Sequence, residues 1–348
     1  MRLSVCMIVK NEEKMLAKTL PNLSKHADEI ILVDTGSTDG TVKVALKFDA
    51  KVFHFTWVNN FSAARNESLK YASGDWILWI DADEFMKEDD LKLLLEILKT
   101  TKANALELTL YESKLDSCER NNGYQRTKVF RNGLGYHFER PINEQLMDKG
   151  SNVVVGKEIP IHIYHWGRHL EKERMSLKRE RYIDLYSQAL KANPADAHLH
   201  FLLAKNLKES GRLNEAVLHY EKAFSSAPDK KIGREALEKM ADILLRAKKL
   251  PEAAKVADRI IKLDPENIPA RNIFASIFLV LGKVDMAIEV LTEVLNIKSA
   301  GEIENLYQSR VMPNFLLGQA YQLKGESEKA QACFARVREI SPELVGAN

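Results

Sequence analysis

The acidic run Asp81-Ala82-Asp83-Glu84 directly follows the hydrophobic segment Trp76–Ile80. Where a parallel strand ends, two carboxylates two positions apart project from the carboxyl edge of the sheet, where ligands bind in open α/β folds. Carboxylate oxygens are the ligands that Mg²⁺ and Mn²⁺ prefer, and phosphate oxygens can complete the shell of such an ion. The pattern predicts a site for a divalent ion that holds a diphosphate. The alternative is that these acids only cap the helix that follows.

A second candidate site follows the short apolar segment of residues 29–33, where Asp34 opens the turn-rich run DTGSTDGT. Gly36 and Gly40 allow the backbone to turn tightly there. Farther along, Arg65 lies within the segment NFSAARNESL, which we expect to be helical. An arginine beside a diphosphate can hold its oxygens in two parallel hydrogen bonds, although a lone arginine is most often a surface charge.

The segments that must position these residues alternate between strand-like and helix-like patterns up to about residue 165. The expected strands are residues 3–9, 29–33, 51–55 and 76–80, and the expected helices are residues 12–23, 43–48, 62–72 and 89–100. Such alternation, with nearly continuous apolar strands, favours a largely parallel sheet covered on both faces. Residues 104–165 are predicted to be richer in strands.

The pattern changes from about Leu170 to a helical repeat. Pro194 and Pro228 are 34 residues apart, which is the period of tetratricopeptide repeats. Small residues recur where paired helices must pack closely, and a proline can end the second helix of a unit. The second marked position of successive units always holds alanine: Ala216, Ala253, Ala287 and Ala330. The longer last interval predicts an insertion near residues 297–311.

These patterns predict three segments. Residues 1–169 would form an α/β catalytic domain, residues 170–193 a linking half-repeat helix, and residues 194–348 an all-α solenoid of about four tetratricopeptide repeats.

Length and composition limit the class of protein. The chain has 348 residues, which suggests about two domains. Its 51 basic and 49 acidic residues leave a net charge of +2, which excludes the basic surface of a dedicated nucleic-acid binder. The three cysteines are too widely spaced for a disulfide framework or a cysteine zinc site, so we expect a cytoplasmic protein. The apolar run Leu3–Val9 is too short for a signal peptide or a membrane span, and we expect a buried strand of a soluble protein.

Three motifs, in this order, resemble the family 2 glycosyltransferases of the GT-A fold. They are LSVCMIVKNEE at the first strand, EIILVDTGSTDGT at the second, and NFSAARNESLKYASGDWILWIDADE leading into the acidic run. The resemblance covers most of residues 1–100. It implies a Rossmann-like α/β fold with a mostly parallel sheet. It also implies transfer of a sugar from a nucleotide sugar, usually a UDP-sugar, with a divalent metal ion on the diphosphate.

The resemblance implies roles for individual residues in nucleotide binding. Val9 and Glu12 would line the nucleotide pocket. Asp34 would contact the base, and Arg65 would reach the base or the phosphates. Many family members have a second aspartate in this turn, whereas this chain has Thr35, so Asp34 alone carries that role.

The metal ligands are implied in the same way. Asp81 would contact the ribose and the metal, and Asp83 would bind the metal directly. A histidine after the last strand of the domain completes the metal shell in the family, and His165 in IPIHIYHWGRH fits this position best. Imidazole suits Mn²⁺ better than Mg²⁺, and either ion is a candidate. Strand alternation places His162 on the opposite face, so at most one of the two histidines would face the metal.

The segment RTKVFRNGLGYHFERPINEQL resembles the acceptor side of the branch whose catalytic domain is followed by helical repeats. An inverting transfer needs a carboxylate that takes a proton from the acceptor as its nucleophile attacks the anomeric carbon. We assign this role to Glu144, with Glu139 and Asp148 as alternatives. Family members commonly have a histidine before this glutamate, where the chain has Asn143. An exposed loop glutamate without a catalytic role is the competing interpretation.

The leading hypothesis is a metal-dependent inverting glycosyltransferase whose repeats recruit a protein or peptide, with the sugar transferred to a Ser, Thr or Cys side chain. A saccharide or lipid-linked acceptor is one alternative, and a non-catalytic repeat scaffold that binds a nucleotide sugar is another. A nucleotidyltransferase ranks last because no glycine-rich, lysine-bearing phosphate loop lies near the first strand. The repeats could also join copies of the chain into a homo-oligomer.

Overall fold

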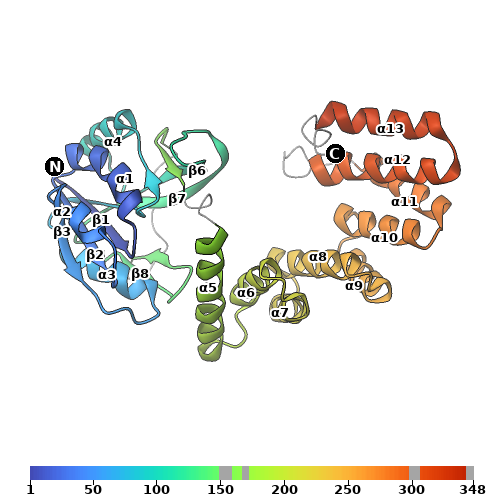
Figure 1. Ribbon diagram of the computed structural model, residues 1–348, viewed down its shortest axis with the longest axis horizontal. Helices are drawn as coiled ribbons and strands as arrows, with labels where there is room; N and C mark the ends of the chain where they lie inside the picture. The colour runs from blue at the N-terminus through green and yellow to red at the C-terminus, as the bar shows by residue number, and fades with distance from the viewer. Residues whose placement is uncertain (149–158, 167–171, 298–305, 342–348) are drawn as a thin grey trace. The chain divides into compact units, whose positions relative to one another are not determined.

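The computed structural model describes residues 1–148, 159–166, 172–297 and 306–341 (Figure 1). The chain divides into two compact units, Met1–Arg181 and Tyr182–Asn348, and the division falls within one helix, α5 (Lys172–Ala192). Among the helices of the described residues, none is long and apolar enough to cross a membrane.

An eight-stranded sheet forms the centre of the first unit, in the order β3-β2-β1-β4-β7-β6-β10-β5. Its strands are β1 (Leu3–Val9), β2 (Glu29–Asp34), β3 (Lys51–His54), β4 (Trp76–Trp79), β5 (Glu84–Phe85), β6 (Ala105–Glu112), β7 (Asn121–Arg131) and β10 (His162–His165). β1 pairs in parallel with β2 and with β4, and β2 pairs in parallel with β3. The mostly parallel α/β sheet expected from the sequence is therefore confirmed.

Two strands run against the parallel direction, β7 inside the sheet and β5 at its edge, where β5 pairs antiparallel with β10. β7 lies between β4 and β6 and runs antiparallel to both, while β6 and β10 are parallel to each other. The strand-rich character expected for residues 104–165 is accounted for by β6, β7, β10 and the small hairpin of β8 (His137–Glu139) and β9 (Gln145–Met147). Because β7 pairs directly with β4, a side chain of β7 can reach the residues that follow β4.

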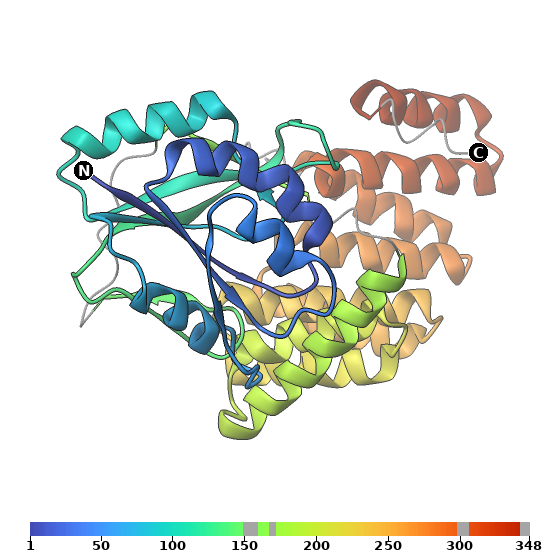
Figure 2. The same cartoon turned by 60° about the vertical axis from the view of Figure 1, so that its left-hand side comes forward.

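Helices and the hairpin cover the two faces of the sheet because alternate strand residues point to opposite sides. Leu3, Val5 and Met7 of β1 belong to the larger core, together with apolar residues of α1 (Glu13–His26), α2 (Thr41–Leu46) and α4 (Glu88–Thr100). Cys6 belongs to the core on the other face, with Trp79, Phe138 of β8, and Leu69 of α3 (Phe61–Lys70). Figure 2 shows α1 and α4 on one side of the sheet and α3 on the other.

The second unit consists of paired helices (Figure 1). After α5 these are α6 (Ala197–Glu209), α7 (Leu213–Ser226), α8 (Lys231–Arg246), α9 (Leu250–Leu263), α10 (Ile268–Val280), α11 (Val284–Asn296), α12 (Met312–Lys324) and α13 (Ser327–Ile340). The four alanines that mark the repeat are buried, as close helix packing requires: Ala216, Ala253, Ala287 and Ala330.

The predicted insertion near residues 297–311 lies only in part within the described residues. Residues 298–305 fall outside them, and residues 307–311 form a π-helical turn that leads directly into α12. The last helix pair is also closely packed, since a Cβ atom on Gly318 of α12 would lie 2.5 Å from the ring of Phe334 in α13.

Candidate active site

The carboxyl ends of β1 and β2 lie side by side, with Val9 opposite Asp34 in the parallel register. The buried carboxylate of Asp34 accepts hydrogen bonds from the backbone N–H groups of Gly36 and Ser37, at 3.3 and 3.1 Å. Thr35 replaces the second aspartate of many family members, and its hydroxyl donates to the carbonyl oxygen of Val9 at 3.0 Å. The turn after β2 is therefore tied to both strands.

The loop after β1 is joined to this same turn. The backbone N–H of Glu12 donates to the hydroxyl of Thr41 at 2.8 Å. The Glu13 carboxylate accepts from the N–H of Gly40 at 3.0 Å, and the Asn11 side chain accepts from the N–H of Thr38 at 2.7 Å. These contacts explain why the first two sequence motifs occur together, since each one holds the other in place.

The acidic run after β4 is organised by a lysine that the sequence reading did not single out. The amine of Lys128, on β7, lies 2.7 Å from Oε2 of Glu84 and 3.6 Å from Oδ2 of Asp81. Oε2 of Glu84 also accepts from the backbone N–H of Asp81 at 2.9 Å. Burial raises the pKa of Glu84, and the charge of Lys128 opposes that effect. Glu84 therefore holds the backbone of Asp81 by this hydrogen bond, and Lys128 holds its side chain by charge.

Arg65 connects the acidic run to the acceptor-side segment. Its guanidinium carbon lies 3.4 Å from the ring centroid of Trp79, a stacking arrangement that suits arginine. One terminal nitrogen forms an ion pair with Glu144 and lies 3.8 Å from Oδ1 of Asp81. The side chains of Arg65 and Glu144 are only 15% and 11% exposed, so this contact is largely shielded from solvent. The structure therefore places Arg65, Asp81 and Glu144 together.

Hydrogen bonds join the segment that carries Glu144 to α3. The Asn66 side chain donates to the carbonyl of Phe138 at 2.8 Å and accepts from its N–H at 2.7 Å. The N–H of Phe61, at the start of α3, donates to the carbonyl of Pro141 at 2.8 Å. Asn143, where family members commonly have histidine, adopts a left-handed conformation with φ of 52°, which asparagine tolerates well.

Glu139 and Asp148, the two alternatives to Glu144 as general base, make different contacts. Glu139 is 56% exposed and its Oε1 lies 3.1 Å from Nε2 of His137. Asp148 acts on Tyr136, whose pKa is raised first by burial and then by this charge. Neither residue has a contact with Arg65 or Asp81 among those described, so the geometry favours Glu144.

Asp83 and His165 form a carboxylate–imidazole pair. Nε2 of His165 lies 3.4 Å from Oδ2 of Asp83. Burial alone would raise the pKa of Asp83, but the hydrogen bond and charge of His165 outweigh it and lower the pKa to about 2. Burial would likewise lower the pKa of His165, but Asp83 raises it overall. His162 instead lies 3.2 Å from Asp90, as alternation along the strand predicts.

These residues fit a divalent ion in their chemistry. Two carboxylates and an imidazole form a donor set that suits Mn²⁺. Nδ1 of His165 is buried without a hydrogen-bond partner, so the protein leaves one polar atom of this set unsatisfied. Among the described residues no three histidine, cysteine or acidic side chains converge on one point, because Asp81 faces Lys128 and Arg65 while Asp83 faces His165.

Comparison with known proteins identifies the first unit. Residues 4–157 match the model of glycosyl transferase family 2. The match shows a glycosyl transferase family 2 domain in this part of the chain. Residues 201–268 and 314–344 match tetratricopeptide repeat models, so the family 2 domain is followed by repeats, as the sequence motifs imply.

Two curated relatives and one solved structure are similar to this chain. A TPR repeat-containing protein of Synechococcus elongatus is 32% identical over 62% of this chain and 54% of its own length. The prophage-derived glycosyltransferase SunS of Bacillus subtilis is 25% identical over 63% of this chain and 52% of its own length. The chain thus spans about half the length of these relatives. Among solved structures, S. aureus TarS is 18% identical, with a TM-score of 0.41 over 74% of this chain and 55% of that one.

Proposed function

We propose that the chain is a metal-dependent inverting glycosyltransferase. It would move a sugar from a nucleotide sugar of the UDP-sugar class to a Ser, Thr or Cys side chain of a protein or peptide recruited by the repeats. The observation that carries this proposal is the position of Arg65. One guanidinium contacts both Asp81, at the end of β4 where the donor would bind, and Glu144, on the segment expected to face the acceptor.

In this proposal Glu144 is the general base. Its carboxylate takes the proton from the acceptor hydroxyl or thiol while the oxygen or sulfur forms a bond to the anomeric carbon. The bond between that carbon and the phosphate oxygen breaks, and UDP leaves with the electron pair. Attack on the face opposite the leaving group inverts the configuration. Arg65 orients Glu144, and Trp79 restricts the motion of Arg65 by stacking against it.

Donor binding would use the loops after β1, β2 and β4. Val9, Glu12 and Asp34 line the nucleotide side, and Arg65 also lies within reach of phosphate oxygens. Asp81, Asp83 and His165 would hold Mn²⁺ or Mg²⁺. When bound, such an ion supplies positive charge that offsets the charge developing on the diphosphate leaving group.

The peptide acceptor is favoured because stacked repeats present an extended surface suited to a polypeptide. A saccharide or lipid-linked acceptor is the alternative within the same enzyme class. A scaffold that binds a nucleotide sugar without turnover is the alternative outside it. A cytoplasmic location and a homo-oligomer formed through the repeats belong to the proposal as well.

Mass spectrometry of candidate acceptors tests the proposal. The full chain is incubated with a panel of nucleotide sugars and Mn²⁺, and with the same panel plus a chelator. We expect one sugar-sized mass increment on a polypeptide, lost with the chelator and with Asp83→Ala. An increment only on saccharide or lipid acceptors would contradict the peptide acceptor. Binding of a nucleotide sugar with no increment on any acceptor would favour the scaffold.

A further inference from the structure

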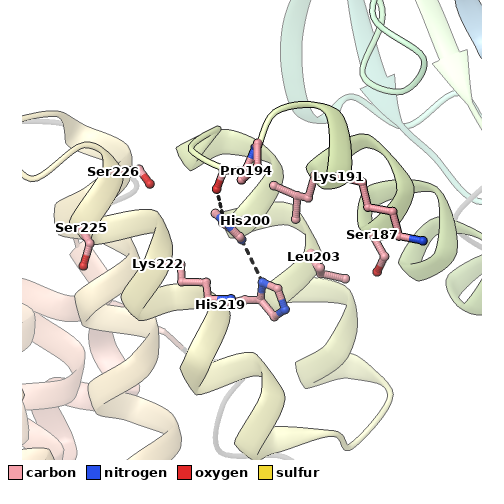
Figure 3. A pocket seen from close by; sticks show the side chains of 10 residues that line it. Ser187, Lys191, Pro194, His200, Leu203, His219, Lys222, Ser225 and Ser226 are labelled. Carbon is pink, nitrogen blue, oxygen red and sulfur yellow. Dashed lines mark hydrogen bonds between the residues drawn. The ribbon is translucent and has the colours of Figure 1, made fainter.

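A pocket of about 510 Å³ lies within the second unit, between α5, α6 and α7. It is distinct from the candidate active site, which belongs to the first unit. Figure 3 shows Ser187 and Lys191 of α5 on one side and Ser225 and Ser226 of α7 on the other, with two histidines between them. The volume falls in the range of about 300–1,000 Å³ typical of ligand sites.

The lining of this pocket is cationic. Lys191 and Lys222 line it, and within the described part of the chain no aspartate or glutamate does. Neither lysine forms an ion pair with any residue that the structure describes. The hydroxyls of Ser225 and Ser226 have no partner among the described residues either, so they can donate to a bound group. Two unpaired ammonium groups beside free hydroxyl donors favour a ligand that carries negative charge.

A chain of hydrogen bonds fixes the protons on the two histidines (Figure 3). Nε2 of His200 lies 3.0 Å from the carbonyl oxygen of Pro194, which can only accept, so this nitrogen carries hydrogen. Burial lowers the pKa of both histidines, that of His219 to about 4, so each ring is neutral at pH 7. Nδ1 of His200 must then accept from Nδ1 of His219, at 2.9 Å. Nε2 of His219 therefore carries no hydrogen and can accept a hydrogen bond.

The remaining lining, apart from Ser187, is apolar. Leu190 and Leu203 are 8% and 2% exposed and, with Pro194, form a hydrocarbon wall. A small inorganic anion would use the lysines and hydroxyls but would leave this wall and the acceptor nitrogen of His219 without a partner. A peptide segment supplies all three kinds of group, because it has carboxylates, aliphatic side-chain stems and backbone N–H donors.

We propose that this pocket binds an acidic segment of the polypeptide acceptor, with its carboxylates on Lys191 and Lys222 and a backbone N–H on His219. The identification of this ligand as the acceptor rests on the glycosyltransferase function proposed above. The preference of the pocket for an acidic peptide is independent of that function. The repeats would then select acceptors by the charge of a sequence remote from the glycosylated side chain.

Fluorescence anisotropy with the full chain and no nucleotide sugar tests the pocket. The probe is a short labelled peptide rich in Asp and Glu, compared with the same peptide carrying Asn and Gln. We expect the acidic peptide to bind at least tenfold more tightly, and more weakly as salt rises from about 50 to 200 mM. The double variant Lys191→Gln with Lys222→Gln should weaken binding about tenfold.

The matched control is Lys239→Gln with Lys255→Gln, which removes the same charge from exposed positions on α8 and α9 and should change binding less than twofold. Far-UV circular dichroism checks that both double variants are folded. Equal binding of the two peptides, an equal effect of the two double variants, or tighter binding of a phosphopeptide of equal charge would overturn the proposal. Acidic-peptide binding without any sugar transfer would leave the pocket intact and refute only the catalytic function.

Discussion

Arg65 and Lys128 are the two cations of the candidate active site, and both lie against the indole of Trp79. The sequence motifs assign both Arg65 and Asp81 to the nucleotide-sugar site, and in the structure the two side chains lie 3.8 Å apart. They did not predict Lys128, because that contact depends on the antiparallel insertion of β7 beside β4. The available signal was a lysine followed directly by the apolar residues Val129 and Phe130, since a buried strand segment rarely carries a charge without a partner.

Replacing Lys128 with Met tests this interpretation at the residue scale. The variant leaves the buried carboxylate of Glu84 without its cation, so we expect the first unit to lose about 3 kcal/mol of unfolding free energy. The double variant Lys128→Met with Glu84→Gln should recover most of that loss, because the amide can still accept from the N–H of Asp81. Urea unfolding followed by tryptophan fluorescence measures both. A double variant no more stable than the single one would contradict the pairing.

At the scale of elements, the sequence revealed the strands that are buried on both faces, and it also revealed β3, which is only partly buried. β1, β2 and β4 are continuous apolar runs, and their positions agree with expectation to within a residue at each end. β7 was not delimited because residues 123–126 are exposed and only its second half is buried against β4. Hydrophobic patterning detects burial, so a strand whose first half is exposed is predicted only in part.

Glu29 links several elements and gives the sheet a pH dependence. Burial would raise its pKa, but hydrogen bonds from Lys51, Ser4 and Ser73 outweigh this and lower the pKa to about 2. A lowered pKa stabilises the fold above the unfolded-state value, and that stability is lost as pH falls from about 4.5 towards 2. We expect wild type to lose about 2 kcal/mol more than Glu29→Gln between pH 6 and 3. Urea unfolding detected by tryptophan fluorescence measures the unfolding free energy of both proteins at each pH. The same pH dependence in wild type and in Glu29→Gln would refute this prediction.

At the scale of the whole molecule, the two sequence patterns correspond to two units with separate cores. All four tryptophans, Trp57, Trp76, Trp79 and Trp166, lie in the first unit, so their fluorescence reports on that unit alone. The repeat period was readable because each unit reuses the same small residues at its helix contacts. The charged pocket of the second unit could not be predicted, since its lining residues other than Pro194 come from three helices and carry no motif of their own.

A glycine substitution separates the two units experimentally. Gly318→Ala places a methyl group against the ring of Phe334, so we expect the repeats to be destabilised by about 1–3 kcal/mol despite alanine's higher helix propensity. Far-UV circular dichroism, dominated by the helices, should show an earlier transition, while the tryptophan transition stays unchanged. Gln322→Ala, at an exposed position of the same helix, is the control. An equal shift in both probes would mean that the units unfold as one.

The most direct test of the account is Mn²⁺-dependent UDP release from the donor and acceptor that mass spectrometry identifies. Glu144→Gln should reduce kcat about a thousandfold, within the range expected for loss of a general base. Arg65→Lys should reduce kcat/KM about a hundredfold, because lysine can neither stack on Trp79 in the same way nor contact Asp81 and Glu144 together. Glu139→Gln should retain wild-type turnover. Wild-type turnover by Glu144→Gln, or its loss in Glu139→Gln alone, would contradict the proposed site.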